Sequence, residues 1–467
     1  MDYWTLRKIV SKLVPRMTQL HSSHRKSEIV QEKGRKKNYS QFNLKLGEWR
    51  KQERLLNTEE INSFLEISVR AAACPMPFNM DIWDGLVCPY NCIYCYANAF
   101  RASLYTAFFD NSKTMGLRHC NPNYYKVELD KMQKLRSLSM DEKRGLTGIN
   151  KAFALEIPVR MGIRFEDFLR NEQKAGVSLQ MLEYLRDQSY PVMLNTKSNV
   201  VGTDPYVRAM SENKAHAAVH VTVISANNEL LKQLEPGAPS YEQRLEGIKN
   251  LTSAGVRVVA RIEPYLYLLN DDPEYLDKYM NDMWGAGVRN ITFDTSSDTA
   301  GNQGLRQNFV NVGYDYDRMF TVGCDSQPLG SLLLGKFMEL FREFGFSCST
   351  FDLGNSPTND QSICCEVEDY FEGGWNYGCT VMAARYICSK EGNSVTWGMF
   401  ERYVNKHGGF LTEDLKTDVK HLWNLEGNVA YSPRWAAGLT PAGRDEDGII
   451  WKKENTDYRE TLINELL

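Results

Sequence analysis

The 467-residue chain lacks any apolar run long enough to cross a membrane. It also lacks an apolar N-terminal core of the kind found in export signals, because Arg7, Lys8 and Lys12 interrupt the first turns. Histidine is scarce, with 7 residues, and the 11 cysteines are an odd number. Since nothing indicates secretion, we expect free thiols or thiolate ligands in a reducing cytoplasm instead of a disulfide framework.

The sequence also lacks the paired cysteines of a zinc site around its most distinctive motif. That motif is Cys88-Pro-Tyr-Asn-Cys92-Ile-Tyr-Cys95, three thiols spaced by three and then two residues. Zinc sites usually show a CxxC pair completed by a second pair or by histidines. Here the nearest cysteines, Cys74 and Cys120, are single, and no histidine occurs from Cys74 to residue 118. A zinc half-site and a disulfide remain alternatives, but the spacing favours an iron–sulfur cluster.

Three thiolates in one loop satisfy all but one iron of a 4Fe-4S cluster. The open iron can be chelated by the amino and carboxylate groups of S-adenosyl-L-methionine. An electron from the cluster can then cleave the sulfonium bond and produce a deoxyadenosyl radical, which is chemistry carried by the cofactor. We therefore predict that Cys88, Cys92 and Cys95 bind the cluster of an enzyme that uses this cofactor.

The motif resembles the CxxxCxφC loop of radical S-adenosylmethionine enzymes, and Cys95-Tyr96-Ala97 resembles their spore photoproduct lyase-like branch. Asn195-Thr196-Lys197-Ser198 is similar to the "TKS" strand end of that branch. The segment from Leu234 to Ser240 is similar to its "LEPRAPS" segment, and Arg244-Leu245-Glu246 follows. The resemblance covers about residues 74 to 350 and implies this cofactor pair and a partial (β/α)6 TIM-like barrel.

Alternating apolar runs and amphipathic segments from residue 150 onward independently predict an α/β fold with a parallel sheet. A capping box at Ser240 and an Asp272-Pro273 start predict helices, and Gly255 and Gly287 predict helix ends. The expected strands are Phe153–Arg160, Pro191–Thr196, Ala218–Ser225, Val256–Ile262, Val288–Asp294 and Phe346–Thr350.

Charge and composition divide the chain into three expected regions: a basic extension over 1–56, a catalytic core over 57–350 and a cysteine-containing extension over 351–467. Net charge is −4, yet residues 1 to 55 carry 14 Lys or Arg and 5 Asp or Glu. A basic run is often a solvated tail, and it is also typical of an arm that contacts nucleic-acid phosphates. Nucleic acid is therefore a candidate partner of this arm.

Ligands of parallel sheets bind at the carboxyl ends of the strands. The polar candidates there, with Tyr94 of the cysteine loop, are Arg160, Thr196, Lys197, Ser198, Ser225 and Glu263. Lys197 can neutralise the cofactor's carboxylate, and Ser198 or Ser225 can hydrogen-bond its ribose or amino-acid end. Glu263 can accept from ribose hydroxyls, and Tyr94 can pack on adenine. Ordinary structural hydrogen bonds are the alternative for each.

Cysteines return in the C-terminal region. A second metal site, either an auxiliary iron–sulfur cluster or zinc, is expected at Cys348, Cys364, Cys365 and Cys379. Buried thiols without a metal are the alternative, because free cysteine is among the most buried residue types.

The resemblance implies radical repair or modification of a nucleic-acid base, with a reductant such as flavodoxin or ferredoxin. The hydrogen-donating cysteine that it implies after the cluster loop has no counterpart, since no cysteine lies between Cys120 and Cys324. Reversal of a thymine dimer is therefore disfavoured. Modification of a peptide or small molecule is the second hypothesis, and a cluster-bearing nucleic-acid-binding protein without turnover is the third.

Overall fold

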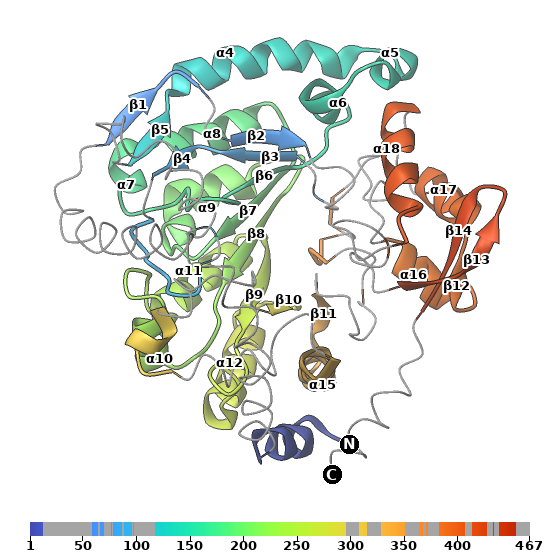
Figure 1. Ribbon diagram of the computed structural model, residues 1–467. Helices are drawn as coiled ribbons and strands as arrows, with labels where there is room; N and C mark the ends of the chain where they lie inside the picture. Colours follow the sequence, from blue (N-terminus) through green and yellow to red (C-terminus); the bar gives the residue numbers. More distant parts are fainter. Residues whose placement is uncertain are drawn as a thin grey trace, which may run out of the picture.

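The computed structural model describes residues 1–12, 58–63, 66–69, 76, 78–85, 88–95, 97, 117–295, 308–314, 328–350, 360, 364–367, 370–371, 383–406, 413–426, 433 and 439–453. An eight-stranded sheet organises most of them, in the order β11-β10-β9-β8-β7-β6-β3-β2 (Figure 1). Its strands are β2 Glu66–Val69, β3 Phe78–Asp81, β6 Val159–Met161, β7 Val192–Thr196, β8 Ala217–Thr222, β9 Arg257–Tyr265, β10 Asn290–Thr295 and β11 Ser347–Thr350.

Seven of these strands run parallel, and only β2 at one edge is antiparallel to its neighbour β3. This confirms the α/β class and the parallel sheet. The sheet has one parallel strand more than the six units expected from the sequence, because β3 precedes the six predicted strands. Within the described part of the chain, no pairing joins the edge strands β2 and β11.

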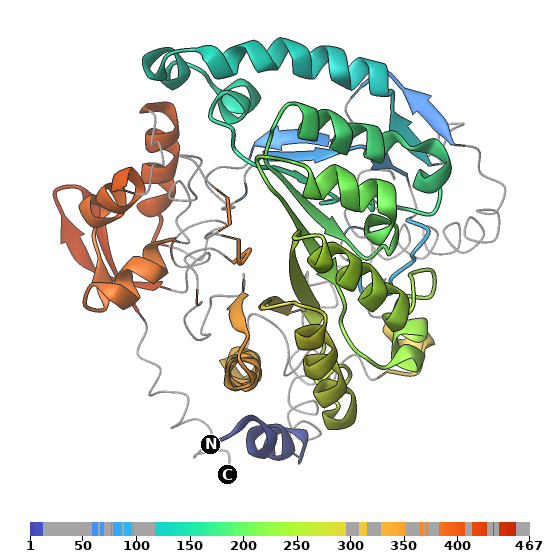
Figure 2. The same cartoon turned by 180° about the vertical axis from the view of Figure 1, so that it is seen from behind.

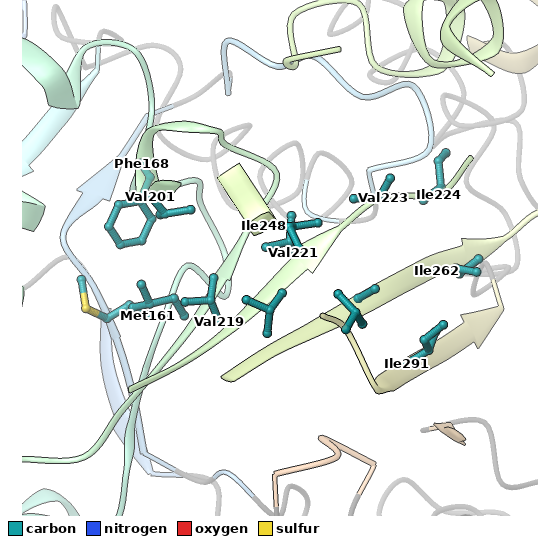
Figure 3. Packing of buried hydrophobic residues seen from close by; sticks show 14 of the residues in the cluster. Met161, Phe168, Val201, Val219, Val221, Val223, Ile224, Ile248, Ile262 and Ile291 are labelled. Atoms are coloured by element: carbon teal, nitrogen blue, oxygen red, sulfur yellow. The ribbon is translucent and has the colours of Figure 1, made fainter. Parts of the chain in front are cut away.

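Helices alternate with the strands and cover one face of the sheet (Figures 1 and 2). They are α4 Pro122–Gln133, α5 Met140–Arg144, α6 Gly148–Ala154, α7 Glu172–Ala175, α8 Val177–Asp187, α9 Asp204–Ser211, α10 Asn228–Leu234, α11 Tyr241–Ser253, α12 Pro273–Gly285 and α15 Pro328–Phe344. The apolar side chains between them and the sheet, such as Val219, Val221, Ile248 and Ile291, pack in one layer (Figure 3). We call this side the helix-covered face and the opposite side the inner face.

The capping signals in the sequence act as predicted. Ser240 closes a capping box with Gln243 at the start of α11, and Asp272 caps α12 ahead of Pro273. Gly255 and Gly287 have φ angles of +80° and +88°, which allow the chain to leave each helix directly before the next strand.

The first predicted strand, 153–160, is wrong over its first half. Residues 148–154 form helix α6, and the strand β6 contains only Val159–Met161. The ring of Phe153 stacks on Tyr190 with centroids 4.7 Å apart, so tertiary packing places this apolar run on a helix. Short apolar runs fit a buried helix and a buried strand equally well by pattern.

Residues 3–12 form a helix that belongs to the core and not to a separate extension. Tyr3 and Leu6 are buried in the main apolar cluster, and Arg7 pairs with Asp271 at 3.0 Å. The basic run over residues 25–37 lies outside the described residues, so its role stays a prediction.

A short second sheet, with strand order β1-β5-β4, lies beside the first (Figure 1). Its strands are β1 Glu59–Ile61, β5 Arg118–Cys120 and β4 Trp83–Asp84. The Nε1 of Trp83 donates to the buried Glu172 at 2.8 Å, which ties this sheet to helix α7.

The C-terminal residues form a small unit with an apolar cluster of its own. Its elements are α16 Ala383–Lys390, β12 Ser394–Val395, α17 Trp397–Lys406, α18 Glu413–Trp423, β13 Leu439–Asp445 and β14 Gly448–Lys453. β14 pairs antiparallel with both other strands, which is the order of a winged helix. Lys416 and Lys420 of α18 pair with Glu401 and Asp447 inside the unit. A fold of this type does not by itself imply nucleic-acid binding.

No helix among the described residues is long and apolar enough to span a membrane.

Candidate functional site

The cysteine loop is a compact turn held by its own backbone. The N–H of Asn91 donates to the carbonyl of Cys88 at 3.0 Å, and the N–H of Cys95 donates to Cys92 at 3.2 Å. Asn91 takes a φ of +49°, a left-handed conformation that asparagine tolerates better than most residues. Cys92 is buried, while Cys88 and Cys95 are half-buried. The loop therefore presents three thiols at different depths.

This loop is fixed against the turn that follows α10, so two motifs separated in sequence form one structure. Ile93 donates its N–H to the carbonyl of Leu234 at 2.9 Å, and Gly237 donates to Tyr90 at 3.0 Å. A Cβ on Gly237 would lie 2.0 Å from the carbonyl oxygen of Pro89. The close approach explains why glycine stands where the "LEPRAPS" segment has arginine.

Glu235 is the charged centre of this contact. Its carboxylate is fully buried and accepts hydrogen bonds from the hydroxyl of Tyr94 and the guanidinium of Arg244. The Nζ of Lys197 lies 3.5 Å from Glu235 and 5.3 Å from the centre of the Tyr94 ring. Burial raises the pKa of Glu235, but Arg244 and Lys197 outweigh it and leave the pKa below its ordinary value. Glu235 is therefore ionised and holds Lys197 beside the cysteine loop.

The donor set fits an iron–sulfur cluster. Each cysteine of a four-iron cluster ligates a different iron, so the three thiols need not converge on one point. The described residues contain no group of three or more His, Cys, Asp or Glu side chains close enough to share a single metal ion. The pKa of Cys92 lies well above its ordinary value because the thiol is buried. The nearby charge of Lys197 offsets part of that rise. The buried Oδ1 of Asn91, inside the loop, has no partner among the described residues, which leaves an acceptor for a bound group.

Thr196 and Ser198, two of the predicted cofactor ligands, have structural partners. Thr196 donates its hydroxyl to the buried Glu166 at 2.7 Å and accepts from the N–H of Ser198 at 2.8 Å. Ser198 accepts from the N–H of Val200 at 3.1 Å. The backbone N–H of Lys197 also donates to Glu166, at 2.8 Å. These bonds fix the strand end so that the Lys197 side chain is the part left to act at the site.

Arg160 and Glu263 lie on the inner face, while Ser225 lies in the loop between β8 and α10. The Nε of Arg160 donates to Asn79 at 3.0 Å. Glu263 accepts from Thr292 at 3.0 Å and pairs with Arg261 on the same strand. The hydroxyl of Ser225 accepts from the N–H of Asn227 at 3.1 Å, and Asn227 in turn caps α10. Their roles in cofactor binding stay predictions.

Two cysteines of the expected second metal site, Cys348 and Cys365, lie in different apolar clusters, and the site stays a prediction. Cys348 is buried among apolar side chains of the helix-covered face. Cys365 packs instead with the cluster that contains Met193 and Ala218, and its Sγ lies 4.0 Å from that of Cys364. Strand alternation explains the separation, because Cys348 points to the face opposite its neighbours Ser347 and Ser349, which donate to Glu366. Cys379 lies outside the described residues.

Two buried carboxylates close to the strand ends are not among the residues predicted from the sequence. Asp167 accepts from the N–H groups of Ile82 and Trp83 at 3.0 and 2.8 Å, and Asp81 accepts from Ile163 at 2.9 Å. Burial, and secondarily the neighbouring Asp81, raises the pKa of Asp167 well above its ordinary value. No pattern in the sequence predicts that such carboxylates are buried. Glu235 is different, because it lies inside the segment similar to "LEPRAPS".

Some curated proteins and solved structures are similar to parts of the chain. No family model matches the sequence. Uncharacterized proteins of Mycobacterium bovis and Mycobacterium tuberculosis are 24% identical to it over 134 residues, 29% of this chain. The match spans 39% of the length of these curated relatives, about two fifths.

Among solved structures, spore photoproduct lyase with a dinucleoside spore photoproduct matches 61% of this chain and 79% of its own, with 13% identity and a TM-score of 0.43. A variant of that lyase with bound AdoMet and the same dinucleoside matches 65% and 83%, with 13% identity and a TM-score of 0.45. The chain is similar to spore photoproduct lyase. Streptococcus suis SuiB bound to its precursor peptide SuiA matches 60% of this chain and 49% of its own, with 12% identity and a TM-score of 0.37.

Proposed function

We propose that this protein is a radical S-adenosylmethionine enzyme whose 4Fe-4S cluster is held by Cys88, Cys92 and Cys95. One observation carries the proposal: the cysteine loop is hydrogen-bonded to the turn after α10, and the two together position Lys197 through Glu235. A loop of soft ligands next to a fixed cation suits a cluster that also binds a cofactor carboxylate. When bound, the cluster and cofactor supply a deoxyadenosyl radical.

The protein's own residues position the cofactor. Lys197 is the cation for its carboxylate, because the lysine shares Glu235 with Arg244 and so keeps donors available. Tyr94 uses its hydroxyl on Glu235 and has Lys197 over its ring, so we assign it to holding the lysine in place of stacking on adenine. Burial of Cys92 and Tyr94 excludes water from the deep side of the loop.

The substrate that we favour is a nucleic-acid base, which the enzyme would modify after extruding it from a duplex. Support comes from the sequence resemblance and from the basic run before residue 55. An electron donor such as flavodoxin or ferredoxin would serve the cluster. The second candidate is a peptide or small molecule modified with the help of an auxiliary iron–sulfur or zinc centre, and it rests on the C-terminal cysteines. Two of these, Cys348 and Cys365, lie in different apolar clusters.

Anaerobic reconstitution tests the reaction class directly. The reduced protein with S-adenosylmethionine is expected to form 5′-deoxyadenosine, measured by mass spectrometry, and to bind about four irons. Absence of deoxyadenosine from iron-loaded protein would contradict the proposal.

Truncation tests the nucleic-acid partner. Because residues 3–12 pack into the core, the informative deletion removes residues 14 to 40 and keeps that helix. If the basic arm contacts phosphates, duplex affinity falls and its salt dependence flattens by about 0.9 per lost contact. An unchanged affinity and salt slope would mean that the arm is a solvated tail.

A further inference from the structure

The inner face of the sheet carries a polar pair that the cysteine-loop site leaves unused. Asn195 on β7 and His220 on β8 are partners in the strand register. Their neighbours Leu194 and Val219 point into the apolar core of the helix-covered face. Because side chains alternate along a strand, Asn195 and His220 lie side by side on the inner face.

Each of the two side chains has a buried polar atom without a partner among the described residues. Asn195 is 8% exposed and His220 is 2% exposed. Among the described residues, neither the Oδ1 of Asn195 nor the Nε2 of His220 has a hydrogen-bond partner. Buried polar atoms are normally paired, so two unpaired atoms on adjacent strands indicate a place for a ligand.

The Nε2 of His220 is an acceptor. A hydrogen bond to the backbone of Cys365 raises the pKa of His220, as donation to a carbonyl does, and the bond must come from Nδ1 because Nε2 is unpaired. Burial, with Arg261 and Arg160, nevertheless lowers the pKa of His220 well below its ordinary value and keeps the ring neutral. A neutral ring that donates through Nδ1 accepts through Nε2. The amide of Asn195 can turn to donate or accept.

The pair lies between Lys197, which follows the carboxyl end of β7, and Tyr370, which contacts the amino ends of β8 and β9. Asn195 precedes Lys197 by two residues on the strand that ends at the site. At the other end of the strands, Tyr370 donates to the carbonyl of Ala217 at 3.2 Å and accepts from the N–H of Arg257 at 3.4 Å. The inner face is thus covered at the amino ends of β8 and β9.

We propose that Asn195 and His220 receive the lactam edge of a nucleobase, an N–H beside a C=O on the same side of a ring, as in uracil. His220 accepts from the ring N–H, and the Asn195 amide donates to the carbonyl. A single trans amide points its N–H and C=O to opposite sides, so it presents only one of the two groups to the pair. Arg160 and Arg261 disfavour a cationic ligand in the same space. This assignment rests on the proposed function and narrows its substrate class.

Nucleoside binding tests the assignment without turnover. Uridine and 3-methyluridine, which lacks the ring N–H, are titrated by calorimetry into the full-length reconstituted protein. We expect uridine to bind about tenfold more tightly, since 3-methylation leaves the Nε2 of His220 without a donor. A model compound with a single trans amide, N-methylacetamide, should not compete.

The variants His220→Phe and Asn195→Leu are compared with His421→Phe, which changes an exposed histidine on α18. The His220→Phe variant should bind the two nucleosides with equal affinity, and Asn195→Leu should bind uridine more weakly than wild type does. His421→Phe should behave as wild type. The melting temperature of each variant checks that it is folded.

Equal affinity of wild type for the two nucleosides, no binding of either, or effective competition by N-methylacetamide would overturn the assignment, even if a variant fails to fold. Deoxyadenosine formation without nucleoside is measured in parallel. Its loss would contradict the proposed function, whereas loss of nucleoside discrimination alone would contradict only this inference.

Discussion

The two faces of the eight-stranded sheet differ in what their side chains require. Val219, Val221 and Ile291 on the helix-covered face are fully packed against helices and need nothing further. On the inner face, Asn195 and His220 are also buried, yet each has an unpaired polar atom among the described residues. Burial on the helix-covered face therefore stabilises the fold. On the inner face, burial leaves polar atoms that a ligand can pair with. The comparison predicts that substitutions on the first face change stability and those at the site change binding.

Removing the three cysteines should have the largest effect at the site. The variant Cys88→Ala, Cys92→Ala, Cys95→Ala loses the thiolates that ligate the cluster, so we expect bound iron to fall from about four atoms to none. Iron analysis after anaerobic reconstitution measures this. Cys348→Ala, on the helix-covered face, should keep its iron; if it lost iron as the triple variant does, Cys348 would be a metal ligand after all.

Ile291→Ala should lower stability and leave S-adenosylmethionine binding unchanged. Ile291 is fully buried on β10, and truncating it leaves a cavity, so the free energy of unfolding should fall by about 2–5 kcal/mol. Denaturant unfolding measures the loss, and Val310→Ala, at a side chain 51% exposed, is the control. Folded Ile291→Ala that binds S-adenosylmethionine much more weakly than wild type would contradict the separation of roles.

Lys197→Ala should weaken S-adenosylmethionine binding while the cluster stays intact. Loss of a charge-assisted hydrogen bond costs about 1.5–3 kcal/mol, or about ten- to a hundredfold in the dissociation constant. Equilibrium binding to the iron-loaded protein tests this, with the exposed Lys249→Ala as control. An unchanged dissociation constant would remove Lys197 from the cofactor site.

The smallest expected effect is the pH dependence caused by His220. Its pKa is lowered in the folded state from 6.5, so the unfolded chain binds the extra proton and folding loses stability as pH falls below that value. Between pH 7.5 and 5.5 the free energy of unfolding of wild type should fall by about 1 kcal/mol more than that of His220→Phe. Urea unfolding at the two pH values measures the difference. His421→Phe should retain the full wild-type dependence, and an identical dependence in His220→Phe would argue against a buried neutral ring.

The sequence predicted most strands because a parallel sheet covered by helices leaves long apolar runs. The strand ends at Thr196 and Thr350 agree with the prediction, and the caps at Ser240 and Asp272 do as well. These features depend on neighbouring residues in the chain. The helix at 148–154 was missed because its apolar run is short and its pairing with Tyr190 is nonlocal.

The sequence by itself determined the cysteine loop, since its three thiols lie within eight residues, and it determined which segments are strands and helices through apolar pattern and capping. Only the tertiary structure decided that Glu235 holds Lys197 beside that loop, that Cys348 faces away from Cys365, and that Asn195 and His220 meet on the inner face. The reason is physical: ligand spacing and caps act over a few residues, whereas the face toward which a strand residue points, and its neighbour on the next strand, depend on the register between distant segments.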